Sequence, residues 1–307
     1  MTSLSVPRFS HQAMGTFYEI FVAGEDASYA GQAARAAFGE IDRLEGLLSR
    51  FDPTSEIARL NRLGPGESLP IGLETFECLS VAERVRGETG GAFDVNWRRP
   101  SPAGAGSPLE LVRTVTGFAA RVRESPDKLL RPLNLDLGAI GKGYALDRSL
   151  EILGEWSIEN ALIHGGTSTA IAIGAPGFEA SIDAARGPSP QGTLPSGWAV
   201  GVGGGWPFED APREIILTGR RALSGSGTEV KGRHIRDPRT GEAAAGHLAA
   251  WALSGSAAEA DALSTAFMVM DTAAVETYCL RRPDAWALVI KAYGDGRIFG
   301  NRVTVTN

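Results

Sequence analysis

The feature that most constrains this chain is its glycine content. The chain has 39 glycines among 307 residues, and many of them stand in short clusters between apolar runs. Glycine adopts positive φ angles at no steric cost and lets a backbone approach a ligand closely. The pattern therefore predicts a globular fold with many tight turns and several points where backbone lies against a ligand.

Length and charge narrow the possibilities further. At 307 residues the chain is long for one core, so we expect a single domain over residues 1–307 or two intimately packed subdomains. Hydrophobic residues make up 43% and charged residues 21%, as in ordinary globular proteins. The net charge of −6 gives no basic signal, and we expect no nucleic-acid partner. A nucleotide ligand would need local positive charge, a helix N-terminus or a bound cation.

The sequence carries no sign of membrane insertion or secretion. The N-terminal residues contain neither an apolar signal core nor a cysteine for lipid attachment, and no apolar stretch is long enough to span a bilayer. We expect a soluble protein, either cytoplasmic or a processed periplasmic form. Cys78 and Cys279 lie among apolar neighbours and are expected to be two buried thiols rather than metal ligands.

Apolar spacing predicts an α+β fold with mixed, mostly antiparallel sheets and packed helices. One short helix is expected to follow Asp52 and Pro53, which resemble an N-cap and the first helical position. The segment at Gly225–Thr228 is expected to form a hairpin turn rather than a phosphate cradle. The expected helices are 27–48, 55–61, 73–87, 144–153, 256–270 and 272–280, and the expected strands are 17–23, 133–137, 161–163, 169–173, 198–202, 214–217 and 287–292. Residues 92–95 are expected to form a turn into a short strand.

Asp261 and Thr265 carry the strongest chemical signal. They stand four residues apart in a predicted helix and therefore share one face, with Ser264 beside them. A carboxylate and hydroxyls on one face are oxygen ligands of the kind that Mg²⁺ binds, near a helix N-terminus that favours phosphate. The alternative is that Asp261 only stabilises the helix N-terminus while Thr265 packs inside.

A second motif has the general plan of an anion site. In residues Leu135–Asp147 a strand runs into a glycine turn that opens a helix, with Lys142 near the helix start. Backbone N–H groups, a helix N-terminus and a lysine together suit a phosphate. The motif is not a Walker A loop, because Gly143 follows the lysine where Ser or Thr is required. A plain strand–turn–helix with a solvated lysine is the alternative.

Two further segments are weaker by themselves. His234 precedes the turn sequence Asp237–Gly241 and could act as a base near neutral pH, although a lone histidine is more often a surface residue. Phe93 and Asp94, in the segment Gly90–Val95, could offer a ring and an acceptor to a ligand. A helix stop followed by a strand explains that segment equally well.

Taken in order, these segments resemble the FAD:protein FMN transferase family, known as ApbE. The resemblance rests on MGT, SRFDPTSEIARLN, GAFDV, LDLGAIGKGYALD, a GG turn, SG, HIRDPRTG and ADALSTA, which span residue 14 to about residue 270. It implies an ApbE-like fold and transfer of FMN from FAD to a Thr or Ser hydroxyl of a partner protein, with release of AMP. Some members of the family instead hydrolyse FAD to FMN and AMP.

The resemblance also implies a set of site residues. His234 would be the base for the acceptor hydroxyl, and Asp261 would be catalytic through the metal that it holds. The implied Mg²⁺ ligands are Asp261, Thr265, Ser264 and the Ala139 carbonyl, and the implied FAD contacts are Met14, Phe51, Ala92, Phe93, Asp94, Asp136, Lys142 and Ile235.

The departures from the family pattern lie on the acceptor side. Thr167 stands where the family has Asp or Asn after the GG turn, and Arg236 replaces a hydrophobic residue. The stretch from Ser224 to His234 is shorter than usual and lacks the common aromatic and acidic residues. Two alternatives to transfer to a protein therefore stay open, an FAD pyrophosphatase and a non-catalytic FAD-binding protein.

Overall fold

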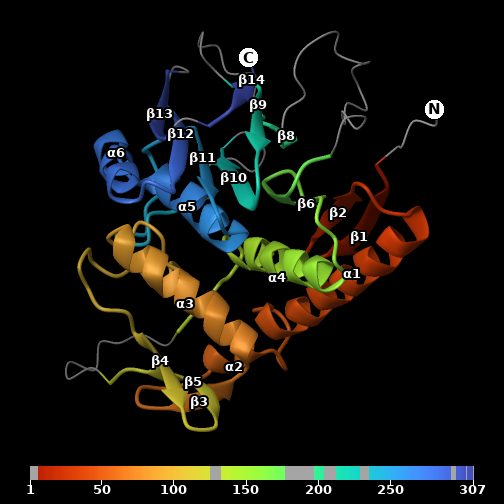
Figure 1. Ribbon diagram of the computed structural model, residues 1–307. Helices are drawn as coiled ribbons and strands as arrows, with labels where there is room; N and C mark the ends of the chain where they lie inside the picture. Colours follow the sequence, from red (N-terminus) through yellow and green to blue (C-terminus); the bar gives the residue numbers. More distant parts are fainter. Residues whose placement is uncertain are drawn as a thin grey trace, which may run out of the picture.

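The computed structural model describes residues 6–124, 133–176, 197–203, 212–228, 235–291, 295–301 and 303–306. Over these residues the chain forms three sheets, and all of their strand pairings are antiparallel. Helices pack against the sheets, and this mixed architecture confirms the predicted α+β class (Figure 1).

The largest sheet has eight strands in the described chain, in the order β1-β2-β6-β7-β10-β11-β12-β13. The strand order follows the chain order, so the sheet is an antiparallel meander interrupted by insertions. Its strands are β1 (Arg8–Ala13), β2 (Thr16–Val22), β6 (Ala161–Gly165), β7 (Thr169–Ile173), β10 (Arg221–Gly227), β11 (Ala249–Ser254), β12 (Trp286–Ile290) and β13 (Gly296–Gly300).

The central strands of this sheet are buried on both faces. Every residue of β11 and of β12 is buried, so their sequences read as continuous apolar runs without alternation. Ala250 and Ala252 of β11 belong to one hydrophobic core, while Trp251 and Leu253 belong to a second core on the opposite face. The sheet therefore separates two cores.

Helices cover the first face. α5 lies against β10 and β11, α4 lies against β6, β7 and α5, and α1 packs on α4 (Figure 1). The long α1 begins with an Asp26 N-cap and buries the stripe of small and aliphatic residues that its periodicity predicts. The helices are α1 (Ala27–Leu48), α2 (Glu56–Leu60), α3 (Leu73–Glu88), α4 (Gly141–Glu155), α5 (Ala257–Val269) and α6 (Thr272–Arg281).

Two smaller sheets lie at opposite ends of the molecule (Figure 1). The sheet β14-β9-β8 contributes Trp198, Ile215 and Leu217 to the second core. The sheet β3-β5-β4 lies beside α2 and α3. Their strands are β3 (Ser68–Ile71), β4 (Leu109–Thr114), β5 (Gly117–Val122), β8 (Trp198–Gly201), β9 (Glu214–Leu217) and β14 (Val305–Thr306).

Two expected strands are corrected by the structure. Residues 92–95 form the expected turn but no short strand, and residues 133–137 form no strand even though their burial alternates. The backbone of Asp136 donates a single bond to the Val95 carbonyl, at 2.8 Å. The side chain of Asn61 accepts from the Leu135 N–H at 2.6 Å and donates to its carbonyl at 3.0 Å. The Asn61 side chain thus supplies the backbone hydrogen bonds that a neighbouring strand would supply in a sheet.

Two local details also differ from expectation. Ser55, not Asp52, caps α2, with the Ser55 hydroxyl accepting from the Ala58 N–H at 3.0 Å. Asp52 instead accepts from the Thr54 backbone and hydroxyl. The segment expected to be a hairpin turn at residues 225–228 begins inside β10, which continues to Gly227. Glycine is required at position 225, because the Cβ atom of any other residue would stand 2.6 Å from Nε1 of the Trp251 indole.

Both cysteines are buried and free, as expected. Burial raises the pKa of the Cys279 thiol to about 12. Burial, together with the nearby Asp261 and Asp147 carboxylates, raises the pKa of Cys78 as well. Both thiols therefore stay protonated near neutral pH.

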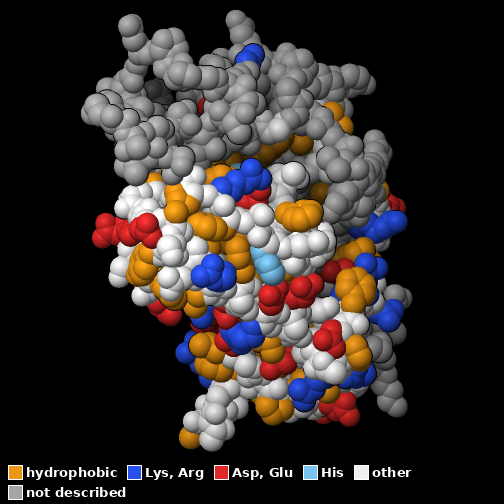
Figure 2. Space-filling view, turned by 90° about the vertical axis from the view of Figure 1, so that its right-hand side faces the viewer, with side chains coloured by type: hydrophobic (Ala, Val, Ile, Leu, Met, Phe, Trp, Pro, Cys, Tyr) orange, Lys and Arg blue, Asp and Glu red, His pale blue; other side chains and the backbone are white. Residues whose placement is uncertain are grey.

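No helix among the described residues is both long enough and apolar enough to cross a membrane. Acidic and basic side chains are interspersed over the described part of the face that Figure 2 shows. On the described part of this face, charges of the two signs are therefore mixed rather than gathered into a field of one sign.

The contact between α4 and α5 is unusually close. A Cβ atom on Gly143 would stand 2.2 Å from the Ala257 carbonyl oxygen, so only glycine fits at this point of α4. One helical turn further on, the Asp147 carboxylate accepts from the N–H groups of Ala257 and Ala258, each at 2.9 Å, and from the Ser256 hydroxyl at 2.7 Å. Asp147 on α4 therefore caps α5 and fixes how the two helices lie together.

Replacing Gly143 by alanine should destabilise the protein. The new methyl group overlaps backbone atoms that cannot rotate away, at a cost of roughly 1–3 kcal/mol. Gly154→Ala is the matched control, because it lies in the same helix with nothing within 4 Å of its Cβ position. The control should be neutral or stabilising by up to about 1 kcal/mol. Urea midpoints measure both changes, and equal midpoints for the two variants would contradict the close contact.

The buried His247 should make stability depend on pH. Its Nδ1 lies 2.6 Å from the Phe267 carbonyl and its Nε2 lies 3.2 Å from the Thr272 hydroxyl. Burial lowers the pKa of His247 below the ordinary value of 6.5. The unfolded chain then binds the proton more readily, so stability is full above that value and falls as the pH drops through it. Unfolding curves between pH 7.5 and 5 should fall less steeply for His247→Gln than for the unaltered protein.

Candidate functional site

The candidate site is built around the Asp261 carboxylate in the second turn of α5. The helix begins at the Ser256 N-cap, and Asp261 is only 4% exposed. Its Oδ2 atom lies 3.4 Å from the Lys142 Nζ and 3.4 Å from the Gly143 N–H at the start of α4. A buried carboxylate thus faces one ammonium group and the N-terminus of a neighbouring helix, both of which stabilise negative charge.

The other carboxylate oxygen of Asp261 faces hydroxyl groups. Oδ1 lies 3.3 Å from the Ser224 hydroxyl on β10 and 3.5 Å from the Thr169 hydroxyl on β7. These two hydroxyls lie 2.9 Å apart and bond to each other. Antiparallel pairing of the two strands sets Ser224 directly opposite Thr169, so the sheet itself places both hydroxyls under α5.

Ser264 and Thr265 extend the oxygen cluster along α5. Ser264 is fully buried and donates to the Asp261 backbone carbonyl at 3.0 Å. Its hydroxyl oxygen lies 2.9 Å from the hydroxyl of Ser226 on β10, and the Thr265 hydroxyl lies 3.3 Å from that same Ser226 oxygen. Thr265 is half-buried, one helical turn beyond Asp261 and on the same face.

The turn before α4 brings further polar groups to this face. The Lys142 ammonium donates to the Gly138 carbonyl at 2.8 Å, and Ala139 follows in the same turn. Asp136 forms an ion pair with Arg50 at 2.9 Å and accepts from Arg98 at 3.3 Å. Two guanidinium groups and one ammonium group therefore stand around residues 136–142.

The turn at Gly90–Val95 lies beside this segment through the bond from Asp136 to Val95. Ala92 and Phe93 are almost fully buried, so a ligand would meet their backbone rather than their side chains. The Asp94 carboxylate is also buried; it accepts from Arg86 at 2.9 Å and from the Asn96 N–H at 2.7 Å.

Phe51 and Met14 differ in their surroundings. The Phe51 ring is 85% exposed, and the Arg50 guanidinium lies 5.2 Å from its centroid. Met14 occupies the β1–β2 turn with a positive φ of 49° and accepts a bond from the Tyr18 hydroxyl at 3.1 Å. Burial, with smaller effects from Asp261 and Glu45, raises the pKa of Tyr18, which keeps its hydroxyl protonated.

The predicted base, His234, lies outside the described residues, and the structure says nothing of its position. Ile235 is buried, and the turn that follows it packs on the loop after α3. In that contact the Ser101 N–H donates to the Pro238 carbonyl at 3.0 Å, and Arg239 lies against Gly91. The two motifs thus meet in space although about 150 residues separate them in the chain.

The donor set around Asp261 suits a hard cation. One carboxylate, several hydroxyls and backbone carbonyls are ligands of the kind that Mg²⁺ prefers. Among the described residues there is no group of three or more His, Cys, Asp or Glu side chains that could hold a metal ion. The oxygen groups around Asp261 would fit a magnesium ion whose remaining ligands come from phosphate oxygens.

Comparison with known proteins shows which family the chain belongs to. The model of the ApbE family matches residues 14–289, which is most of the sequence. The chain belongs to the ApbE family. The family membership confirms the resemblance that the ordered motifs indicate.

Curated relatives and solved structures agree with this assignment. The FAD:protein FMN transferase of Salmonella typhimurium is 23% identical over 312 residues, covering 93% of this chain and 84% of that protein. The enzyme of the same name from Escherichia coli is 23% identical over 84% of this chain and 77% of that protein. These relatives are enzymes, and the ApbE chain described here is an enzyme too.

The fold agrees as well. The crystal structure of the ApbE protein from Thermotoga maritima matches with a TM-score of 0.71 and 23% identity over 96% of this chain and 97% of that chain. The apo flavinyl transferase ApbE of Pseudomonas stutzeri matches with a TM-score of 0.72 and 20% identity over 96% of this chain and 95% of that chain. The predicted ApbE-like fold is confirmed.

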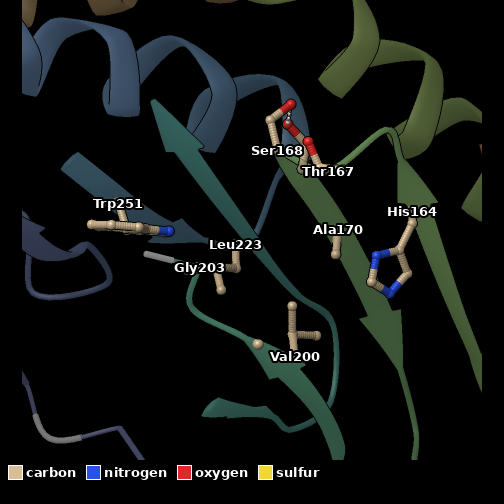
Figure 3. A pocket seen from close by; sticks show the side chains of 10 residues that line it. His164, Thr167, Ser168, Ala170, Val200, Gly203, Leu223 and Trp251 are labelled. Carbon is tan, nitrogen blue, oxygen red and sulfur yellow. Dashed lines mark hydrogen bonds between the residues drawn. The ribbon is translucent and has the colours of Figure 1, made fainter. Parts of the chain in front are cut away.

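A cavity of about 150 Å³ lies on the second face of the large sheet (Figure 3). His164, Val200 and Trp251 border it, from β6, β8 and β11, and burial lowers the pKa of His164. Thr169 borders this cavity and also contacts Asp261. Ligand pockets usually enclose about 300–1,000 Å³, so this cavity is too small for a dinucleotide such as FAD.

A larger cavity of about 350 Å³ lies between α3 and α4. Arg148 and Arg220 border it beside the Asp147 carboxylate, so charges of both signs face its interior. Burial raises the pKa of Asp147, against the hydrogen bonds from Ala258, Ala257 and Ser256. Neither of the two cavities includes Asp261.

Sequence reasoning missed the residues that surround Asp261 from other elements. Thr169, Ser224 and Ser226 come from strands. Ser224 lies in the SG segment and Ser226 in the segment Gly225–Thr228, but nothing in the sequence placed either of them beside Asp261. Asn61 and Asp147 were also missed. Both residues end segments that carry the resemblance, SRFDPTSEIARLN and LDLGAIGKGYALD, but their partners, Leu135 and the start of α5, are distant in the chain, so only the fold shows what they do.

Asn61→Ala should loosen the segment that carries Asp136 and Lys142. The change leaves the N–H and the carbonyl of Leu135 without their partner, at a cost of about 1–3 kcal/mol. Asn301→Ala is the control, because that exposed side chain donates only to the Pro283 carbonyl. Denaturant unfolding gives the loss of stability, and amide exchange should speed up over residues 133–142. Unchanged exchange there would rule out this role for Asn61.

Proposed function

We propose that this ApbE protein transfers FMN from FAD to a Thr or Ser hydroxyl of an acceptor protein and releases AMP. The observation that carries the proposal is the buried Asp261 carboxylate, which lies beside Lys142 and a cluster of hydroxyl groups. The names of the curated relatives support FAD as the substrate and a protein as the acceptor. The magnesium requirement, the type of acceptor residue and the release of AMP are part of the proposal.

The residues suited to holding Mg²⁺ are Asp261, Thr265 and the Ala139 carbonyl, with Ser264 adjacent. The ion would neutralise charge on the pyrophosphate of FAD and polarise its phosphorus–oxygen bonds. Lys142 supplies a positive charge for the phosphates, at the N-terminus of α4. Asp261 thus has a partner of opposite charge before any ligand binds.

Other residues are proposed to hold the flavin. The exposed Phe51 ring offers a flat surface for stacking, with Arg50 beside it. Asp136 and the backbone of the Ala92–Asp94 turn offer acceptors and donors next to the same face. The remaining contacts with the flavin are proposed to come from Met14 and Ile235, which lie in distant parts of the sequence.

The bond changes follow from the proposed reaction. The acceptor hydroxyl oxygen bonds to the phosphorus of the FMN half, the bond from that phosphorus to the bridging oxygen breaks, and AMP leaves with that oxygen. The acceptor hydroxyl loses one proton, which His234 is proposed to take.

Asp261→Asn should reduce transfer of FMN by at least about 100-fold, because loss of the metal carboxylate removes several kcal/mol of transition-state stabilisation. The matched control is Asp271→Asn, at the exposed N-cap of α6, where asparagine also caps a helix. The assay incubates protein, FAD and Mg²⁺ with a candidate acceptor and measures the acceptor's mass and the AMP formed.

The same assay without acceptor separates the alternatives. FMN and AMP formed without any acceptor would indicate an FAD pyrophosphatase. A saturable yellow complex with neither product would indicate a flavin-binding protein. Full transfer by Asp261→Asn would show that the proposed site is wrong.

A further inference from the structure

The serines of β10 lie under the part of α5 that carries the proposed metal ligands. Ser224 and Ser226 are two residues apart in a strand, so both face α5. Gly225 between them faces the other way, against the Trp251 indole. We propose that Ser226 is a positioning residue that accepts the proton of the Thr265 hydroxyl and so turns the Thr265 lone pairs toward the cation. This inference rests on the proposed function.

Counting protons favours one direction for the hydroxyl chain, and this direction is part of the proposal. Each hydroxyl has one proton to donate, and a backbone carbonyl can only accept. Ser264 donates to the Asp261 carbonyl at 3.0 Å or, in the longer contact of 3.4 Å, to Ser224. The Ser226 contact of 2.9 Å allows either oxygen to donate, and we propose the arrangement in which Ser264 keeps its bond to the Asp261 carbonyl and accepts from Ser226.

Ser226 then donates to Ser264 across the short contact of 2.9 Å. Its own proton is used, so toward Thr265 it can only accept, across 3.3 Å. In the proposed direction of the chain, the proton of Thr265 points at β10. Both contacts join the same strand to the same helix, and β10 and α5 pack along one another.

This orientation matters because a neutral hydroxyl binds a cation through its lone pairs. A proton pointing at the cation would repel it, whereas a partner that takes the proton leaves the oxygen free to coordinate. Ser226 thus acts on the cation through Thr265, as outer partners of metal ligands generally do.

The test measures binding of Mn²⁺ to metal-free protein, with and without AMP, from the electron paramagnetic resonance signal of the free ion. Mn²⁺ takes the same oxygen ligands as Mg²⁺. Ser226→Ala should weaken binding about 10- to 100-fold, the usual effect of losing an outer partner of a metal ligand. Ser226→Thr keeps the hydroxyl and should restore binding to near the original value. The control is Ser149→Ala, which removes a buried hydroxyl bonded only to its own helix at Ala145 and should leave binding unchanged.

A second comparison separates positioning from a loss of structure. Thr265→Val should weaken Mn²⁺ binding, and adding Ser226→Ala to that variant should weaken it little further. The melting temperature of each variant in EDTA shows whether the metal-free protein is still folded. An undiminished affinity in Ser226→Ala, or fully additive losses in the double variant, would overturn the proposal.

The proposed function can fail independently of this inference. Mn²⁺ binding that depends on Ser226 and Thr265 as described, without any transfer of FMN, would leave the inference intact and reject the transferase. Transfer of FMN by a protein that binds no Mn²⁺ at millimolar concentration would reject the inference and the magnesium requirement, and would keep only the transfer of FMN.

Discussion

The close contact between α4 and α5 is the constraint on which the rest of the site depends. Gly143 lets the two helices touch backbone to backbone, and Asp147 uses its carboxylate to satisfy the free N–H groups at the start of α5. These two contacts fix both the distance and the register of the helices. Asp147 bonds to the Ala257 N–H, and Asp261 lies four residues further along α5. In this register the Lys142 ammonium group and the Gly143 N–H both reach the Asp261 carboxylate. A shift of one turn would separate the ammonium group from the carboxylate and expose the buried charge.

The second determinant is the sheet beneath α5. Antiparallel pairing places Thr169 opposite Ser224, and the two-residue period of a strand places Ser226 on the same side. The helix contributes one carboxylate and two hydroxyls, and the strands contribute three more hydroxyls. The site therefore gathers many neutral oxygens around a single negative charge. A cluster of carboxylates would repel the negative charges of a pyrophosphate, and a site with a single carboxylate reduces that repulsion.

Much of the fold could be predicted, and each failure has its own physical cause. The periodicity of α1 gave its bounds, and the helix expected at residues 256–270 matches α5, which begins after its N-cap at Ser256. The strand predicted at residues 133–137 is wrong because alternating burial also arises when a segment is held by a side chain, here Asn61, instead of by a strand. β10 was misjudged because Gly225 reads as a turn residue, whereas it serves a close approach of the Trp251 indole.

The sequence by itself determined the ApbE family, the α+β class and the two motifs that carry Lys142 and Asp261, because these rest on local spacing and on the order of motifs along the chain. The roles assigned to the individual site residues stay predictions, and His234 lies outside the described residues. Only the tertiary structure decided which groups surround Asp261. The hydroxyls of Thr169, Ser224 and Ser226 lie about 40 to 90 residues away from it in the chain. Nothing local marks a serine as part of such a cluster, since its role depends on the face of the strand it occupies and on the helix packed above it.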